Sequence, residues 1–471
     1  MIHPSRTIAI VGAGFSGTVV AINLLQQQPA AATRVILLDR APPGRGVAYA
    51  DREYPYLLNV PAGRMSAEAG DPLEFLRFAL TRIPGVTAQD FLPRSLYGEY
   101  LESRLCAAEA NAVTGVRLER VLGTATSVQL LNRGPRHCVS LADGESLLAD
   151  DVVLALGNPP SAPLPGAEKL VGSARYIADP WSVPATFRAG ERVLVVGTGL
   201  TMADVVVAGA SAAQRDVQFY AISRHGLVPP SQAAIGHEPV QVDTRRLIEA
   251  ATFSTRALFR AIRELADDFG RRGGDWREVI NHIRNIAPQL WQRMPARERQ
   301  RFLRHLRPYW DIHRHRLPRQ TLAEIEKLRR ERKLSVHAGR ILGLECVADQ
   351  VRVTWRPRGA RTSATLLVDR VINCTGPDYD PRRSRDPLLV SLLAQGVAVP
   401  DALGLGVRTA AFGALLDVQG RTSKGLYYVG PMLRPDHWES TAVPELRAHA
   451  TRLAHHLTSA VLKRTVANQT S

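Results

Sequence analysis

Lysine and cysteine are both scarce in this chain of 471 residues. Only five lysines are present, so the formal net charge of +16 comes almost entirely from arginine. The charge is spread along the chain without a recognisable nucleic-acid module, which is typical of a compositional bias, and we expect no nucleic-acid partner. The four cysteines are scattered, which argues against a disulfide framework and a cysteine-rich metal site. We therefore expect a cytoplasmic protein without a bound metal.

Long apolar runs and the spacings of familiar catalytic groups are also absent. No run approaches the length of a membrane span, and the N-terminus leads almost directly into a strand, so we expect neither a membrane contact nor a signal peptide. No Ser-His-Asp, Cys-His or paired-carboxylate pattern has a diagnostic spacing. The composition, 45% hydrophobic and 22% charged, predicts a folded chain of two or three domains. Such a chain fits an enzyme in which a cofactor does the chemistry.

Glycines follow the first predicted strand, residues 8–11. A second apolar strand, residues 35–38, ends at Asp39, 25 residues after the middle glycine of the motif. In the dinucleotide-binding fold the first glycine permits a tight turn, and the second lets the backbone approach a pyrophosphate at a helix N-terminus. A carboxylate at the end of the second strand accepts hydrogen bonds from free ribose hydroxyls. The predicted FAD site consists of Gly12, Gly14, Phe15, Ser16, Gly17, Asp39 and Arg40.

The same register occurs again after a strand at residues 193–196. A further strand, residues 217–222, leads to Arg224, again 25 residues after the second glycine of its motif. An arginine here pairs with a 2′-phosphate, which favours NADPH over NADH. Met202 replaces the third glycine, so we expect this helix to lie slightly farther from its sheet. The predicted NAD(P)H site consists of Gly197, Gly199, Thr201 and Arg224.

Each half also ends in an apolar strand with a glycine turn, at residues 151–157 and 369–376, and residues 425–430 form a similar strand. This arrangement resembles flavoproteins with two dinucleotide-binding domains, in which such strands return the chain beneath the cofactor. The resemblance implies cofactor contacts at Gly157, Gly376 and Gly430. Pro431 stands where many relatives have an aspartate that binds the flavin ribityl chain, so the chain departs from the family pattern at that contact.

The motifs predict an α/β fold with two Rossmann-like domains, the second nested in the first. Residues 1–165 and 377–471 would form the FAD-binding domain, and residues 166–376 the NAD(P)H-binding domain with a helical insertion at about 240–332. The nesting follows from the resemblance, because spacing alone also allows two sequential domains. The insertion contains an amphipathic helix with a basic end, residues 313–316. This end is either a solvated helix terminus or part of a lid that meets anionic ligands.

Two local sequences are candidates for the substrate side of the flavin. In the resembling flavoproteins the loop after the second strand passes near the flavin ring, which makes Asn59 a candidate contact to the cofactor and Arg64 a candidate for the substrate; a turn cap and a surface residue are the simpler alternatives. Near the end of the chain, Trp438 and Glu439 precede a predicted helix that begins near residue 443. In the resembling proteins the N-terminus of this helix faces the flavin, so both residues would line the substrate pocket; core packing is the alternative.

The motifs resemble those of flavin-dependent monooxygenases with a separate nicotinamide domain. A close cysteine pair and the Baeyer-Villiger signature are both absent, which disfavours dithiol reductases and that monooxygenase subgroup. The segments after the first motif are more similar to a bacterial FAD/NAD(P)-binding group, which implies a small-molecule substrate and molecular oxygen. The leading hypothesis is hydroxylation of a small anionic heterocycle, best represented by urate converted to 5-hydroxyisourate. An amine N-hydroxylase of the ornithine or lysine type and a non-catalytic, redox-sensing FAD binder are the alternatives.

Overall fold

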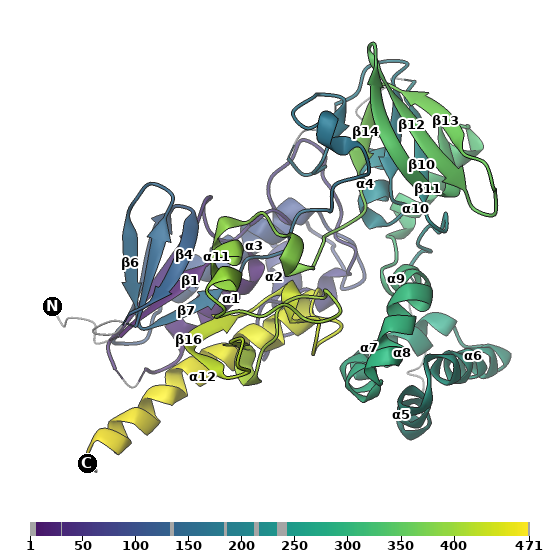
Figure 1. Ribbon diagram of the computed structural model, residues 1–471. Coiled ribbons are helices and arrows are strands. Elements are labelled where there is room, and N and C mark those ends of the chain that lie inside the picture. Colours follow the sequence, from purple (N-terminus) through teal and green to yellow (C-terminus); the bar gives the residue numbers. More distant parts are fainter. Residues whose placement is uncertain are drawn as a thin grey trace. The chain divides into compact units, whose positions relative to one another are not determined.

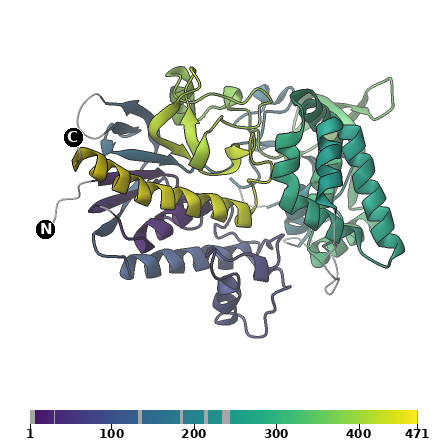
Figure 2. The ribbon, with the colours of Figure 1, turned by 90° about the horizontal axis from the view of Figure 1, so that it is seen from below.

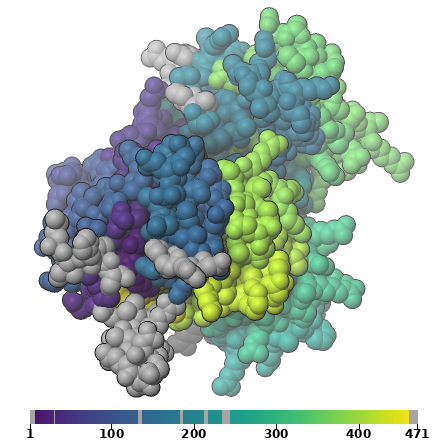
Figure 3. Space-filling model, turned by 60° about the vertical axis from the view of Figure 1, so that its left-hand side comes forward, coloured from purple at the N-terminus to yellow at the C-terminus, as the bar shows by residue number. Residues whose placement is uncertain are grey.

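The structure is a computed structural model, which describes residues 6–29, 31–131, 136–182, 186–211, 216–232 and 243–469, with side chains as far as residue 459. The chain forms two compact units. The first consists of residues 1–51, 60–159 and 379–471, and the second of residues 52–59 and 160–378. The second unit therefore interrupts the first, and in Figure 3 the purple-to-blue and yellow-green segments of the first unit lie side by side.

The first unit is built on a six-stranded sheet in the order β15-β16-β7-β1-β2-β3. Neighbouring strands are parallel except at β15, which is antiparallel to β16. A separate antiparallel sheet has the order β4-β5-β6. The strands are β1 (Arg6–Val11), β2 (Thr33–Asp39), β3 (Val116–Leu122), β4 (Ala125–Leu130), β5 (His137–Leu141), β6 (Ser146–Ala149), β7 (Asp151–Leu154), β15 (Ala414–Leu416) and β16 (Thr422–Tyr428).

Helices and the smaller sheet cover the main sheet of this unit. One apolar core joins alternate residues of β1, β2 and β7 to the smaller sheet and to α11, and α1 packs with α3 and α12 (Figure 2). Because both faces are covered, the central strands read as continuous apolar runs. The helices are α1 (Phe15–Gln26), α2 (Glu74–Leu80), α3 (Arg94–Ala110), α11 (Pro387–Ala394) and α12 (Val443–Gln469), with short 3-10 turns η1 (Ala62–Arg64), η4 (Pro381–Arg383), η5 (Ala411–Gly413) and η6 (Pro431–Leu433).

The second unit repeats the central strand order of the first. Its sheet has the order β13-β12-β11-β10-β9-β14-β8, so β14-β9-β10-β11 corresponds to β7-β1-β2-β3. The strands from β8 to β11 pair in parallel, and β12 and β13 add an antiparallel edge. The strands are β8 (Tyr176–Ile177), β9 (Arg192–Val196), β10 (Gln218–Ser223), β11 (Leu334–Val347), β12 (Gln350–Pro357), β13 (Ala364–Val368) and β14 (Arg370–Asn373).

The predicted insertion consists of helices α5 to α10. In Figure 1, α5 to α9 gather into one group, whereas α10 packs on α4 and contributes to the core beneath the sheet. The elements are α4 (Leu200–Ser211), α5 (Thr244–Phe253), α6 (Thr255–Arg271), α7 (Trp276–Arg293), α8 (Ala296–Arg301), α9 (Arg307–Arg314) and α10 (Arg319–Arg330), with η2 (Ala167–Lys169) and the π-helical η3 (Phe302–Leu306).

Two details differ from the sequence-based expectations. The amphipathic helix expected in the insertion is divided into α8, η3 and α9, because Pro308 lacks the amide hydrogen that would continue the α-helical ladder. Residues 52–59, expected in the first domain, pack with the second unit instead. Tyr56 lies edge-on to Trp181 with ring centroids 5.4 Å apart, and Arg52 donates a hydrogen bond of 2.6 Å to the backbone oxygen of Trp181.

Candidate functional site

The first glycine motif forms the turn between β1 and α1. Gly12 has a φ of +103°, and a Cβ atom there would lie 2.3 Å from the backbone oxygen of Ala155. A Cβ on Gly17 would lie 1.8 Å from the oxygen of Gly12, so both positions require glycine for packing within the protein. Gly14 differs, because its Cβ would meet only the Cα of Gly46, at 3.8 Å. A side chain at Gly14 would therefore not clash with the protein, so packing within the protein does not explain this glycine, whereas the close approach of a pyrophosphate would.

The residues around this turn lie as the motif predicts. Phe15 and Ser16 begin α1 and are buried. The Asp39 carboxylate ends β2, accepts a hydrogen bond of 2.5 Å from the backbone amide of Ala13, and accepts another of 2.6 Å from the amide of Arg40. It is half-buried at the edge of the turn, and the Arg40 side chain is exposed. Asp39 can therefore reach a ribose beside the glycine turn.

A loop that the sequence analysis did not assign to the site packs over the first glycine turn. A Cβ on Gly46 would lie 2.9 Å from the Cα of Gly14, so this loop must also be small where it crosses the turn. Arg45 holds the loop through a hydrogen bond of 2.7 Å from Nε to Glu102 and an ion pair of 2.6 Å with Asp51. Gly98 permits the approach, since its Cβ would lie 2.5 Å from the oxygen of Tyr49. The glycines at positions 44, 46 and 98 are the sequence signal from which the close approach of this loop to the turn could have been predicted.

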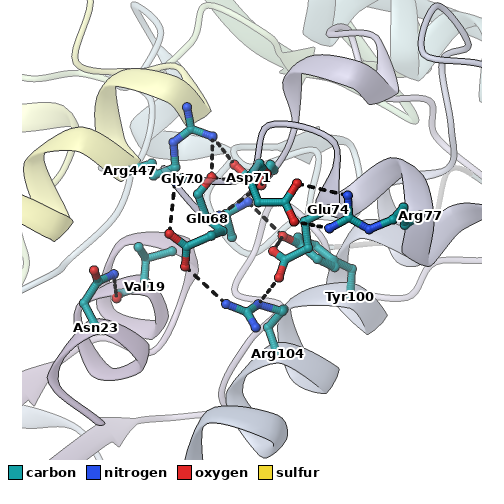
Figure 4. Close-up of polar contacts among 12 residues, drawn as sticks. Val19, Asn23, Glu68, Gly70, Asp71, Glu74, Arg77, Tyr100, Arg104 and Arg447 are labelled. Atoms are coloured by element: carbon teal, nitrogen blue, oxygen red, sulfur yellow. Dashed lines mark hydrogen bonds and ion pairs between the residues drawn. The ribbon is translucent and has the colours of Figure 1, made fainter. Parts of the chain in front are cut away.

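An aromatic and polar cluster lies next to this loop, since the rings of Tyr49 and Tyr97 are 4.6 Å apart. Figure 4 shows polar members of the cluster, among them Glu74, Tyr100 and Arg447. The buried ring of Tyr97 stacks near Phe15 at 6.3 Å, and its hydroxyl has no hydrogen-bond partner among the described residues. The hydroxyl of Tyr100 bonds to Glu74, and burial raises the pKa of that carboxyl. Arg447 of α12 donates hydrogen bonds of 2.7 and 3.2 Å to the backbone oxygens of Ser66 and Glu68, so the cluster fixes the first turns of α12.

The second glycine motif repeats the same geometry between β9 and α4. Gly197 has a φ of +117°, and its Cβ would lie 2.3 Å from the backbone oxygen of Cys374. Gly199 has no atom within 4 Å of its Cβ position, so this turn also leaves space beside its second glycine. Thr201 lies in the first turn of α4, and Met202 is fully buried in the core of the unit.

The end of β10 carries hydroxyl groups where β2 carries a carboxylate. The Ser223 and Thr198 hydroxyls lie 2.8 Å apart, and the Ser223 hydroxyl accepts a hydrogen bond of 3.0 Å from the amide of Gly226. Arg224 follows with an exposed side chain. The site therefore lacks the carboxylate that would repel a 2′-phosphate and has an arginine available to bind one.

The closing strands β7, β14 and β16 are each followed by a turn that contains a glycine. Gly157 and Gly376 have φ values of +69° and +83°, and neither Cβ position has an atom within 4 Å. Gly430 follows β16 with a φ of +139°. Tyr379 donates a hydrogen bond of 2.9 Å to the side-chain oxygen of Asn158, which ties the turn after β7 to the returning chain. The cofactor contacts expected at these glycines stay predictions.

Asn59 and Arg64 fall in different units. The backbone oxygen of Asn59 accepts a hydrogen bond of 3.0 Å from Gln232 within the second unit, whereas Arg64 ends η1 in the first unit and is exposed. The two residues therefore belong to different compact units, because the aromatic residues just before Asn59 pack with the second unit. Their roles toward the flavin and the substrate stay predictions.

Trp438 and Glu439 lie just before α12 and are buried, with 4% and 3% of their surface exposed. The Arg434 guanidinium carbon lies 4.3 Å from the centre of the Trp438 ring and 4.9 Å from that of Tyr379. This stack fixes Trp438 beside the N-terminus of α12, where the helix dipole is positive. A role in binding substrate stays a prediction for both residues.

The basic end of the insertion is not a simple solvated helix terminus. Arg316 is only 5% exposed, and its Nη2 donates a hydrogen bond of 2.6 Å to the side-chain oxygen of Asn281. Burial and the charges of Arg314 and Arg277 lower its pKa to about 10. His313 packs edge-on against Trp276 at 5.0 Å. Of the two alternatives given for this end, a solvated helix terminus does not hold for Arg316, and His313 is only partly exposed; whether the end forms part of a lid stays a prediction.

Within the described ranges, no group of three or more His, Cys, Asp or Glu residues could hold a metal ion. In that same part of the chain, the structure has no helix long and apolar enough to cross a membrane.

The comparisons with known proteins agree with this geometry. Residues 9–159 match a family model described as FAD-NAD(P)-binding. No curated protein matches the chain. Among solved structures, the chain resembles ornithine N-hydroxylase from Kutzneria sp. 744, with a TM-score of 0.59 and 15% identity over 96% of this chain and 99% of that one.

Two further structures show the same likeness. Ornithine hydroxylase from Pseudomonas aeruginosa in its reduced form has a TM-score of 0.62 and 15% identity over 96% of this chain and 99% of that one. L-lysine 6-monooxygenase from Pseudomonas syringae has a TM-score of 0.62 and 16% identity over 98% of this chain and 100% of that one. At these identities the likeness establishes the fold, and it confirms the expected two-domain Rossmann architecture.

Proposed function

We propose that this chain is an FAD-dependent, NAD(P)H-driven monooxygenase of the amine N-hydroxylase class. The observation that carries the proposal is the pair of glycine turns on two separate α/β units, in each of which a side chain on the second glycine would clash with no protein atom. The likeness of the whole chain to ornithine and lysine hydroxylases supports the amine class. It favours the alternative of the sequence analysis over urate, for which the comparisons give no support.

The residues of the first turn fit FAD. Gly14 would leave room for the pyrophosphate, the N-terminus of α1 would face its charge, and Asp39 would accept hydrogen bonds from the ribose. When bound, FAD would take a hydride from the nicotinamide and supply the oxygen chemistry. The chain's own residues would orient the ring and exclude water around it.

The second turn fits a nicotinamide dinucleotide. Gly199 would approach its pyrophosphate, and Arg224 would select NADPH by pairing with the 2′-phosphate. The hydroxyls of Thr198 and Ser223 keep the end of β10 free of negative charge. We therefore expect NADPH to be used in preference to NADH.

Glu439 would bind the ammonium group of an amine substrate beside Trp438. Its carboxylate is buried, and a buried carboxylate interacts more strongly with a cation than an exposed one does. Urate remains a second candidate because of one observation, the buried Arg434 guanidinium stacked on the same tryptophan, which would attract an anion. An amine would therefore bind through the Glu439 carboxylate, whereas urate would bind through the Arg434 guanidinium.

A substrate panel with purified, FAD-loaded protein tests the proposal. NADPH oxidation, oxygen uptake, hydroxylamine product and released hydrogen peroxide are measured with ornithine, lysine, cadaverine and urate. We expect hydroxylamine in proportion to NADPH oxidised for one of the amines, and Glu439→Gln should raise the KM for that amine at least about tenfold while leaving the FAD content unchanged. Hydroxylated urate with no hydroxylamine would support the second candidate. No oxygen uptake with NADPH or NADH would overturn the monooxygenase proposal.

A further inference from the structure

Two strands of the second unit, β10 and β12, end at the same level of β11, the strand between them, beside the proposed nucleotide site. Ser223, the last residue of β10, is in register with Ala338 of β11, and Gly339 of β11 is in register with Pro357 of β12. The amide of Arg358 then donates a hydrogen bond of 2.9 Å to the backbone oxygen of Ala338. Arg358 therefore leaves β12 at the level where the chain leaves β10.

The turn after β10 also folds toward this place. Gly226 has a φ of +62°, and its Cβ position lies 3.0 Å from the backbone nitrogen of Ala338. Arg224 and Arg358 are thus separated by the width of β11, which places their backbones about 10 Å apart, or two strand spacings. Two extended arginine side chains can meet across such a distance, so both guanidinium groups can reach one phosphate.

Both arginines also act on one neighbouring side chain, that of His225. Both arginine side chains are exposed, and His225, which follows Arg224 in the chain, has its ring 5.7 Å from that of Tyr309. Partial burial and the charges of Arg358 and Arg224 together lower the pKa of His225. His225 therefore lies within electrostatic range of both arginines.

We propose that Arg358 is a second ligand for the 2′-phosphate of NADPH, acting together with Arg224 across the end of β11. The inference rests on the proposed use of NADPH and names a specificity residue that the glycine motif does not contain. A phosphate dianion accepts several charge-assisted hydrogen bonds, so two guanidinium groups bind it better than one. NADH has a free hydroxyl at that position and gains nothing from the second arginine.

Equilibrium binding tests this without turnover. Adenosine 2′,5′-bisphosphate and adenosine 5′-monophosphate, which differ only in the 2′-phosphate, are titrated calorimetrically into the FAD-loaded protein. We expect the wild type to prefer the bisphosphate, and Arg358→Ala to weaken its binding about tenfold while leaving the monophosphate unchanged. Arg358→Lys should retain part of the preference, since it keeps the charge but not the planar fork.

Arg352→Ala is the matched control, because Arg352 is a partly exposed arginine of β12, the strand that Arg358 follows, and bonds to Glu345 instead. It should retain the full preference. If Arg358→Ala also retains it while Arg224→Ala loses it, the second ligand is refuted. If the wild type shows no preference, the 2′-phosphate site as a whole is refuted, and oxygen-dependent turnover with NADH would show that the monooxygenase proposal still stands.

Discussion

Glycines with the same place in a motif meet different physical demands here. Gly12 and Gly197 turn the chain in a backbone conformation that few other residues adopt, and each would clash with a backbone oxygen if it carried a Cβ. Gly14 and Gly199 have ordinary φ values and no clash with the protein. Packing within the protein does not require glycine at these two positions, whereas the approach of a pyrophosphate to the backbone would.

Substitution of the unconstrained glycines should therefore affect ligands and leave the fold intact. We expect Gly14→Ala to purify with wild-type stability but largely without FAD, because the methyl group occupies the space for the pyrophosphate. Gly199→Ala should keep its FAD and lose binding of the nicotinamide nucleotide. Gly270→Ala is the control, since its Cβ also meets no atom but lies in α6. Flavin absorbance per protein and thermal unfolding measure these outcomes, and a fully yellow Gly14→Ala protein would contradict the site.

At the scale of elements, local patterns identified most strands and helices around the motifs. The β-branched runs ending in glycine became β1, β9, β7 and β14, and the predicted C-terminal helix begins at Val443. What the sequence could not give depends on contacts between distant segments. The loop with Gly46 is recognisable as part of the site only once it crosses Gly14, and Arg358 only once β12 pairs with β11. Neither contact leaves a periodic signal in the chain.

The first half of α12 contains a histidine that should make the protein sensitive to acid. His449 packs against His437 with ring centroids 4.5 Å apart, and burial together with His437 and Arg452 lowers its pKa to about 3. An unfolded chain takes up this proton near pH 6.5, whereas the folded chain does not. The free energy of unfolding should therefore fall below pH 6.5, by roughly 1.4 kcal/mol per pH unit from this group.

His449→Phe keeps an aromatic ring and removes the titration. Urea unfolding at pH 7, 6 and 5 should show that this variant loses less stability with acid than the wild type does. His455→Phe on the exposed side of the same helix is the control and should follow the wild-type curve. Parallel curves for His449→Phe and the wild type would show that the buried imidazole accepts a proton in the folded state.

At the scale of the whole molecule, the chain passes between the two units four times, after residues 51, 59, 159 and 378. The shortest excursion is residues 52–59, which leave the unit with the first glycine motif and return to it. Tyr54 packs partly buried against the core of the second unit, and its ring lies 5.0 Å from that of Tyr56. Residues 52–59 therefore fold with the second unit, which contains the second glycine motif, although the segments before and after them belong to the first unit.

This division predicts which ligand a mutation in the segment should affect. Tyr56 is only 7% exposed, so Tyr56→Ala should destabilise the second unit by about 2–4 kcal/mol through the lost burial and the cavity left behind. We expect thermal unfolding to gain an early transition that a nicotinamide nucleotide raises and that added FAD does not. Phe253→Ala, at an 83% exposed position of α5 in the same unit, should leave unfolding nearly unchanged. A loss of FAD from Tyr56→Ala as large as that from Gly14→Ala would mean that the segment belongs energetically to the first unit.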